Sequence, residues 1–136
     1  MKIDISQIVS SIGEPVTGSA TVNAYKYLLE GKTMEAENIL FDLHDEIYWS
    51  GSRNSTTDAI VAQICKERGI TCNPCIVKEA VWRRIRGHIS MAYDIMANGI
   101  KKKPYGKMIN GKYRLIDGYN RVAMAIAMGM TEIDVE

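Results

Sequence analysis

The sequence lacks any apolar run long enough to cross a membrane, and it contains few cysteines. A membrane-spanning helix needs about 18 or more consecutive apolar residues, and the 136 residues contain no such run. The N-terminal segment carries Asp4 and no long apolar stretch, so we expect no secretory signal. Three cysteines cannot all pair with one another. We therefore expect a cytoplasmic protein with reduced thiols.

The chain also lacks the compositional bias of disordered proteins. Hydrophobic residues make up 46% of it, charged residues make up 24%, and the formal net charge is +1. Low hydrophobicity combined with a high net charge would prevent a core from forming, and neither is present. A chain of this length buries about two thirds of its unfolded surface without help from disulfides or metals. We expect one compact domain.

The two halves of the chain differ in charge. Residues 1–70 contain six Lys or Arg against ten Asp or Glu, whereas residues 71–136 contain eleven against six. Residues 78–121 hold eleven basic residues and only three acids. This split indicates that the C-terminal half faces an anion, such as a nucleic acid. The alternative is that the two halves pair with each other.

Apolar residues at helical spacing dominate the first hundred residues. Asp4 is expected to cap the first helix, while Asn73 as N-cap and Pro74 at the first position start a later one. Gly87 is expected to break or bend that later helix. The ranges expected to be helical are 4–12, 21–30, 33–49, 56–68 and 74–98.

From Lys101 onward the pattern changes to short strands. Asn110-Gly111 predicts a hairpin, because both positions of a type I′ turn need positive φ. A helix is expected over 120–128, capped by Asn120. The ranges expected to form strands, from their alternation of side chains, are 105–109, 113–117 and 131–135.

The turn between the second strand and the last helix is the strongest candidate for a binding site. Amide N–H groups at a helix start bind anions, because their unpaired donors and the helix dipole act together. Arg121 lies in that first turn, where a cation is unfavourable to the dipole. It fits better if it grips the same anion as the amides. The alternative is a plain strand–turn–helix in which Arg121 pairs with Asp117.

The stretch GKYRLIDGYNRVAMAIAMGMTEIDV, with IMANGIKKKPYGKMI before it, resembles the ParB/sulfiredoxin-like superfamily. The resemblance covers residues 88–136. It implies a small ParB/sulfiredoxin-like sheet-and-helix unit over residues 88–136. Together with the helical pattern of the N-terminal half (residues 1–87), this predicts an α+β fold.

The resemblance also implies a set of site residues and a ligand. The phosphates of a nucleoside triphosphate with Mg²⁺ would be bound at the turn, with Asp117 as a ligand of the metal or of a hydroxyl group. Tyr119 stands where sulfiredoxins have their catalytic cysteine and partition proteins their glutamate, so sulfiredoxin chemistry is not expected. The residues implied to bind phosphate or nucleotide are Asp117, Gly118, Asn120 and Arg121.

Two functions remain open on this reading. The first is a nucleotide- or phosphate-binding, ParB-like protein associated with DNA, with phosphoryl transfer or nuclease activity left undecided. The second is a non-enzymatic phage or plasmid protein that inhibits or regulates a host protein machine. Neither involves a membrane, and both are compatible with an oligomer.

Two groups of basic residues are candidates for contact with a nucleic-acid backbone. Helices 56–68 and 74–86 are arranged somewhat like a helix-turn-helix, whose recognition helix needs exposed basic side chains. The alternative is a basic edge that faces only solvent. The candidates are Lys101, Lys102 and Lys103 in the loop and Arg83, Arg84 and Arg86 on the helix.

The cysteines are expected to be structural. Cys65, Cys72 and Cys75 have a spacing that is irregular for zinc, and no strand precedes the C-x-x-C as in redox sites. Small, buried, apolar side chains are the favoured interpretation, and no metal site is expected.

Overall fold

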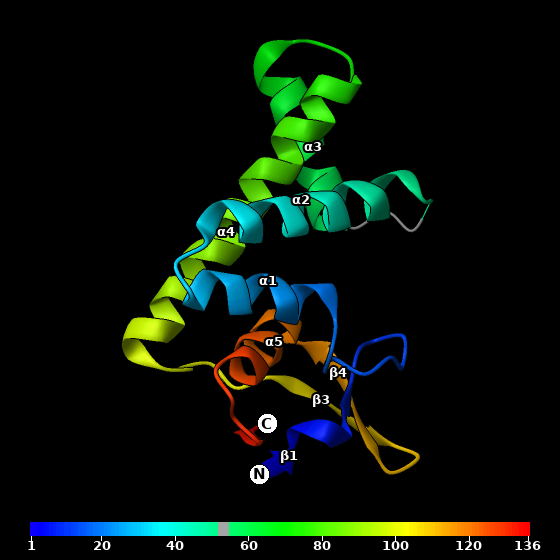
Figure 1. Cartoon of the computed structure of the whole chain (residues 1–136). Helices are drawn as coiled ribbons and strands as arrows, with labels where there is room; N and C mark the ends of the chain where they lie inside the picture. Colours follow the sequence, from blue (N-terminus) through cyan, green and yellow to red (C-terminus); the bar gives the residue numbers. More distant parts are fainter. Residues whose placement is uncertain (52–54) are drawn as a thin grey trace.

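The computed structural model describes residues 1–51 and 55–136 (Figure 1). These residues form a mixed α+β structure, with helices in the middle of the chain and strands toward both ends. None of the helices in this part of the chain combines the length and the apolar character that crossing a membrane requires. In chain order the elements are β1 (Lys2–Asp4), the 3₁₀ helix η1 (Ile5–Gln7), β2 (Ile8–Val9), α1 (Ala20–Leu29), α2 (Thr33–Trp49), α3 (Ser55–Arg68), α4 (Pro74–Asn98), β3 (Tyr105–Ile109), β4 (Lys112–Asp117), α5 (Tyr119–Ala127) and β5 (Glu132–Asp134).

The helix expected over residues 4–12 is wrong. The Asp4 carboxylate accepts hydrogen bonds from the Ser6 amide at 2.8 Å and the Ser6 hydroxyl at 2.7 Å, but it caps only the single turn η1. The β-branched pair Ile8 and Val9 then lies parallel to β4. β1 pairs antiparallel with β5. Local periodicity does not reveal these pairings, because the partner strands come from the other end of the chain.

The first nine residues therefore supply two strands, β1 and β2, to the sheets. The helices expected to fill the N-terminal half lie instead in the middle of the chain. One sheet has the order β2-β4-β3, and β1 and β5 form a second, two-stranded sheet. The two termini lie side by side there (Figure 1). The boundary drawn between residues 87 and 88 falls inside α4. That helix is continuous, so Gly87 does not end it.

Two local predictions are confirmed. The β3–β4 hairpin turns at Asn110 and Gly111, whose φ angles are 51° and 77°, as a type I′ turn needs. α4 begins with Pro74, and the Asn73 side chain accepts a hydrogen bond from the Cys75 amide at 3.0 Å. Short-range signals in turns and caps thus predict these places correctly.

The core is built in layers around α5. Figure 1 shows α2, α1 and α5 stacked in that order above the strands, with α4 passing alongside them. Residues 122–125 of α5 are fully buried. Two of these, Ala123 and Ala125, are small, so the helix packs closely on its neighbours. α3 packs against the first half of α4, and this pair of helices projects away from the sheets (Figure 1).

Candidate functional site

The predicted phosphate-binding turn lies where β4 ends and α5 begins. Gly118 is the N-cap of α5, with a φ of 100° in the left-handed region. Because glycine has no side chain, the cap residue offers no acceptor to the first-turn N–H groups. Asn120, expected as the N-cap, is instead the second residue of the helix. The first-turn N–H groups therefore receive no side-chain acceptor from the cap residue, and Gly118 itself is buried beside Pro104.

Gly118 also lies close to the preceding loop. A Cβ atom there would lie 2.8 Å from Cα of Pro104. We expect Gly118→Ala to lower the free energy of unfolding by about 1–3 kcal/mol, because a clash and an unfavourable φ act together. Urea denaturation measures the loss. Gly31→Ala is the matched control, since Gly31 has a φ of +79° but open space around it. Equal losses at both positions would contradict the close approach.

The Arg121 guanidinium joins the turn to the basic loop, which we define as Lys101, Lys102 and Lys103. Its Nη1 donates to the carbonyl oxygens of Lys102 at 2.9 Å and Lys103 at 3.2 Å. Its Nη2 donates to the Asp117 carboxylate at 3.1 Å. Only 15% of the Arg121 side chain is exposed. The contact with Asp117 was predicted by the alternative in which the turn is a plain strand–turn–helix. Nothing in the sequence predicted the two contacts with carbonyl oxygens.

Two lysine side chains of the basic loop, Lys102 and Lys103, form exposed ion pairs. Nζ of Lys102 lies 3.7 Å from the Asp117 carboxylate, and Nζ of Lys103 lies 3.3 Å from Asp134. The terminal ammonium group of Met1 and, after it, Lys103 lower the pKa of Asp134 below its ordinary 3.8. Exposed pairs of this kind contribute little to stability. The ammonium groups can therefore exchange a carboxylate for a phosphate.

A pocket of about 290 Å³, the loop pocket, lies beside the basic loop. Ile95 and Ile133 are buried in it, and Met128 and Met130 are each 41% exposed. Lys101 and Lys103 of the basic loop and Asp134, which pairs with Lys103, add charged groups to the lining. Gly99 and Ile100 complete it.

The Asn120 side chain is turned to the interior. Its carbonyl oxygen accepts a hydrogen bond from the Tyr25 hydroxyl at 2.8 Å, and its amide nitrogen lies 3.5 Å from Nε2 of His88. The other three predicted phosphate-binding residues lie at the basic loop. Asn120 thus connects the turn to a second set of polar groups.

That set, the interior polar cluster, lies among α1, α2, α3, α4 and α5. The rings of His44 and His88 have centroids 5.2 Å apart, and Nη1 of Arg84 donates to Oγ1 of Thr57 at 3.0 Å. Within the described residues, Nδ1 of His88 and Nε of Arg84 are buried without a hydrogen-bond partner. The cluster consists of Tyr25, His44, Thr57, Arg84, His88 and Asn120.

Burial sets the protonation of this cluster. Desolvation, followed by the charges of Arg84 and His88, lowers the pKa of His44 from 6.5 to about 3. Desolvation, followed by Arg84, lowers the pKa of His88 to about 4. Desolvation also raises the pKa of Tyr25 and lowers that of Arg84. Both histidines are neutral at pH 7 on these values, and Arg84 carries the charge. The sequence did not lead us to predict this cluster. The one feature that could have indicated it is the spacing of Arg84 and His88, which places both on one face of the same helix.

The three candidate arginines of α4 do not share one surface. Arg83 pairs with Glu79 at 3.6 Å, and Arg84 reaches into the interior polar cluster. Arg86 lines a pocket between α2 and α4. At 1.5 Å per residue along α4, Arg86 lies on the order of 20 Å from the basic loop. The structure therefore brings the lysines together with the turn and leaves the arginines apart.

The prediction that the cysteines are buried is wrong for two of them. Cys72 and Cys75 are exposed and Cys65 is half-buried, and all three thiols are free. Exposure follows from their place at the tip between α3 and α4, which projects from the layers. Across the described residues, no three His, Cys, Asp or Glu side chains are placed to hold a metal ion together.

Comparison of the chain with protein-family models, with curated proteins and with solved structures finds no match.

Proposed function

We propose that the protein binds phosphate groups of a nucleotide or of a nucleic-acid backbone, at the basic loop and the turn 117–121, as a ParB-like protein associated with DNA. The observation that carries this proposal is the pair of hydrogen bonds from Arg121 to the Lys102 and Lys103 carbonyl oxygens. They hold successive lysines against a helix start whose cap residue offers no acceptor. Ammonium and helix N–H groups are two of the donor types with which proteins bind phosphate.

Arg121 acts in this proposal as a positioning residue. Its two terminal nitrogens already donate to three acceptors, so phosphate contact falls to the lysines and the first-turn N–H groups. Mg²⁺ is usually held by one or two carboxylates together with substrate phosphates. The carboxylate of this turn, Asp117, is engaged by Arg121 and Lys102. We therefore propose that this site binds phosphate, and we do not propose Asp117 as a ligand of Mg²⁺.

A thermal-shift screen tests the proposal. Nucleoside mono-, di- and triphosphates, each with and without Mg²⁺, are added to the protein and to Arg121→Ala. A ligand at a hundred times its Kd stabilises a protein by about 2.7 kcal/mol, which is readily measured. We expect at least one nucleotide to raise the Tm of the parent, and Arg121→Ala to lose most of that rise because its lysines are no longer held.

The matched control is Arg83→Ala, which removes an arginine from an exposed pair with Glu79. It should keep the nucleotide-dependent rise in Tm. The proposal fails if no nucleotide raises the Tm of the parent. The assigned role of Arg121 fails if Arg121→Ala binds as well as the parent, or if it unfolds without ligand.

A second candidate function, binding to an acidic host protein, is supported by the loop pocket. Exposed methionines adapt to different partners, and Met128 and Met130 lie beside Lys101 and Lys103 there. A partner segment with an apolar side chain flanked by acidic residues would fit this pocket. Met130→Asp should weaken such a protein complex, as measured by pull-down, and leave the nucleotide-dependent rise in Tm unchanged.

A further inference from the structure

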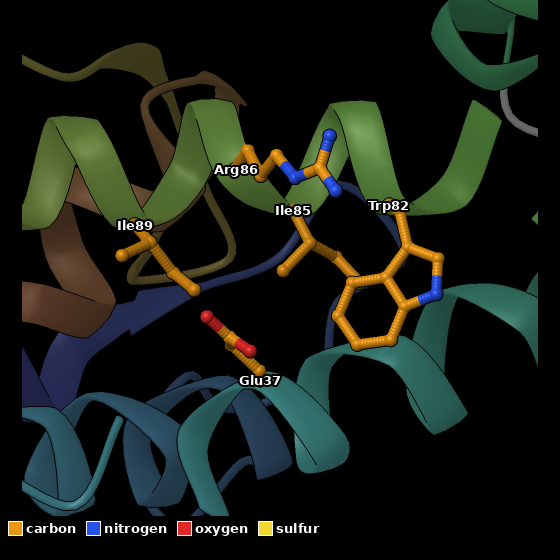
Figure 2. A pocket seen from close by; sticks show the side chains of 5 residues that line it. All are labelled: Glu37, Trp82, Ile85, Arg86 and Ile89. Atoms are coloured by element: carbon orange, nitrogen blue, oxygen red, sulfur yellow. The ribbon is translucent and has the colours of Figure 1, made fainter. Parts of the chain in front are cut away.

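A pocket of about 260 Å³ lies between α2 and α4, far from the basic loop; we call it the α2–α4 pocket. Figure 2 shows that α4 supplies its apolar lining, from Trp82, Ile85 and Ile89. Ile85 and Ile89 belong to the buried core, and the Trp82 ring packs on Phe41 with centroids 4.7 Å apart. The apolar lining is therefore held rigidly by the packing behind it.

Each helix adds one charged side chain to this pocket. α2 supplies Glu37 and α4 supplies Arg86. In Figure 2 the Glu37 carboxylate points from α2 toward Ile89, whereas the Arg86 guanidinium lies along α4 above Ile85. Among the described residues, the ion pairs include neither Glu37 nor Arg86. Glu37 is half-buried and Arg86 is exposed, so a ligand can reach both charged groups from solvent.

We propose that the α2–α4 pocket binds a small zwitterion, namely a free α-amino acid with an apolar side chain. Its ammonium group pairs with Glu37, its carboxylate pairs with Arg86, and its side chain lies on Trp82 and Ile85. Opposite charges beside an apolar surface match the three parts of such a molecule. An internal residue of a peptide carries neither charge and a terminal residue carries one, so both charges together favour the free amino acid.

The size of the pocket agrees with this ligand. A water molecule takes about 30 Å³ in the liquid, so the pocket has room for roughly nine waters and only a small ligand fits. Pockets that take drug-sized ligands usually start at about 300 Å³. This site shares no residue with the basic loop or the turn 117–121, so it stands apart from the proposed phosphate binding.

Tryptophan fluorescence tests the proposal directly. The chain has two tryptophans, Trp49 and Trp82, so Trp49→Phe leaves Trp82 as the single reporter inside the pocket. Titration of this variant with leucine, methionine and phenylalanine should give a saturable change with at least one of them. N-acetyl-leucine lacks the ammonium group and leucinamide lacks the carboxylate. Each should bind at least tenfold more weakly than leucine, and this comparison leaves the pocket unaltered.

Charge-neutralising variants provide the second arm. Glu37→Gln and Arg86→Gln, in the Trp49→Phe background, should each weaken amino-acid binding at least tenfold. Glu35→Gln and Lys78→Gln remove exposed charges from the same two helices and should change nothing. The proposal is overturned if none of the three amino acids gives a saturable change. It is equally overturned if the capped forms bind as well as leucine, or if the two pocket variants bind as well as their controls.

Discussion

Lowering the pH from 7 to 5 is expected to reduce the free energy of unfolding by on the order of 1–2 kcal/mol for each of His44 and His88. Both histidines titrate near 6.5 in the unfolded chain, whereas burial holds their folded pKa values at about 3 and about 4. Below pH 6.5 the unfolded state therefore binds more protons than the folded state. Stability is highest above that pH and is lost progressively toward the folded pKa values.

Urea denaturation at pH 7 and pH 5 measures this loss. The control is the double variant His44→Gln and His88→Gln, which keeps polar side chains in the interior polar cluster but removes the titrating groups. Its stability should depend much less on pH over this range, which lies above the ordinary pKa values of the carboxyl groups. If the parent and the double variant lose equal stability, the depressed histidine pKa values are wrong.

Replacing the basic loop with three glutamates, Lys101→Glu, Lys102→Glu and Lys103→Glu, is expected to abolish measurable binding to duplex DNA. Each phosphate that a protein neutralises contributes about −0.9 to the slope of log K against log salt, so three lysines give a slope near −3. Affinity of the parent should then fall about 40-fold between 50 and 200 mM salt. Fluorescence anisotropy with labelled duplexes measures both effects, which should be the same for all sequences, because phosphate contacts carry no sequence information.

The candidate arginines of α4 supply the comparison for this experiment. Arg83 and Arg86 lie away from the basic loop, so Arg83→Glu and Arg86→Glu together should leave most DNA affinity and the salt slope unchanged. If this double variant loses binding while the triple lysine variant keeps it, DNA contact belongs to α4. If the parent does not bind DNA at low salt, the backbone-binding form of the proposal fails, while nucleotide binding is judged by the thermal-shift screen alone.

Short-range signals in the sequence predicted most elements of the fold. Asn73-Pro74 marks the start of α4 and Asn110-Gly111 marks the hairpin, because caps and turns depend on a few adjacent residues. The turn at Gly118 was also predicted from a strand that meets a helix at a glycine. Its contact with Pro104 depends on a loop that precedes the hairpin, and no local pattern reports that approach.

Long-range pairings account for the errors. The apolar spacing of Ile5, Ile8 and Val9 fits a helix as well as it fits buried strands, and only the pairing with β4 and β5 decides between them. The interior polar cluster was not predicted for the same reason, because its members come from five helices that are brought together only in the folded chain. Arg121 shows the limit at the site itself. Its place beside Asp117 was predictable from a spacing of four residues, whereas its bonds to the loop carbonyls depend on tertiary structure.

The pairing of β1 with β5 has a consequence for the order of folding during synthesis. Lys2 faces Asp134 and Asp4 faces Glu132, so β1 lacks this partner until residues 132–134 leave the ribosome. At about 5–20 residues per second, the wait is on the order of ten seconds. Local helices form far faster than this. We expect ribosome-bound chains that end before Glu132 to protect the amides of α1 and α2 from hydrogen exchange while those of β1 exchange freely.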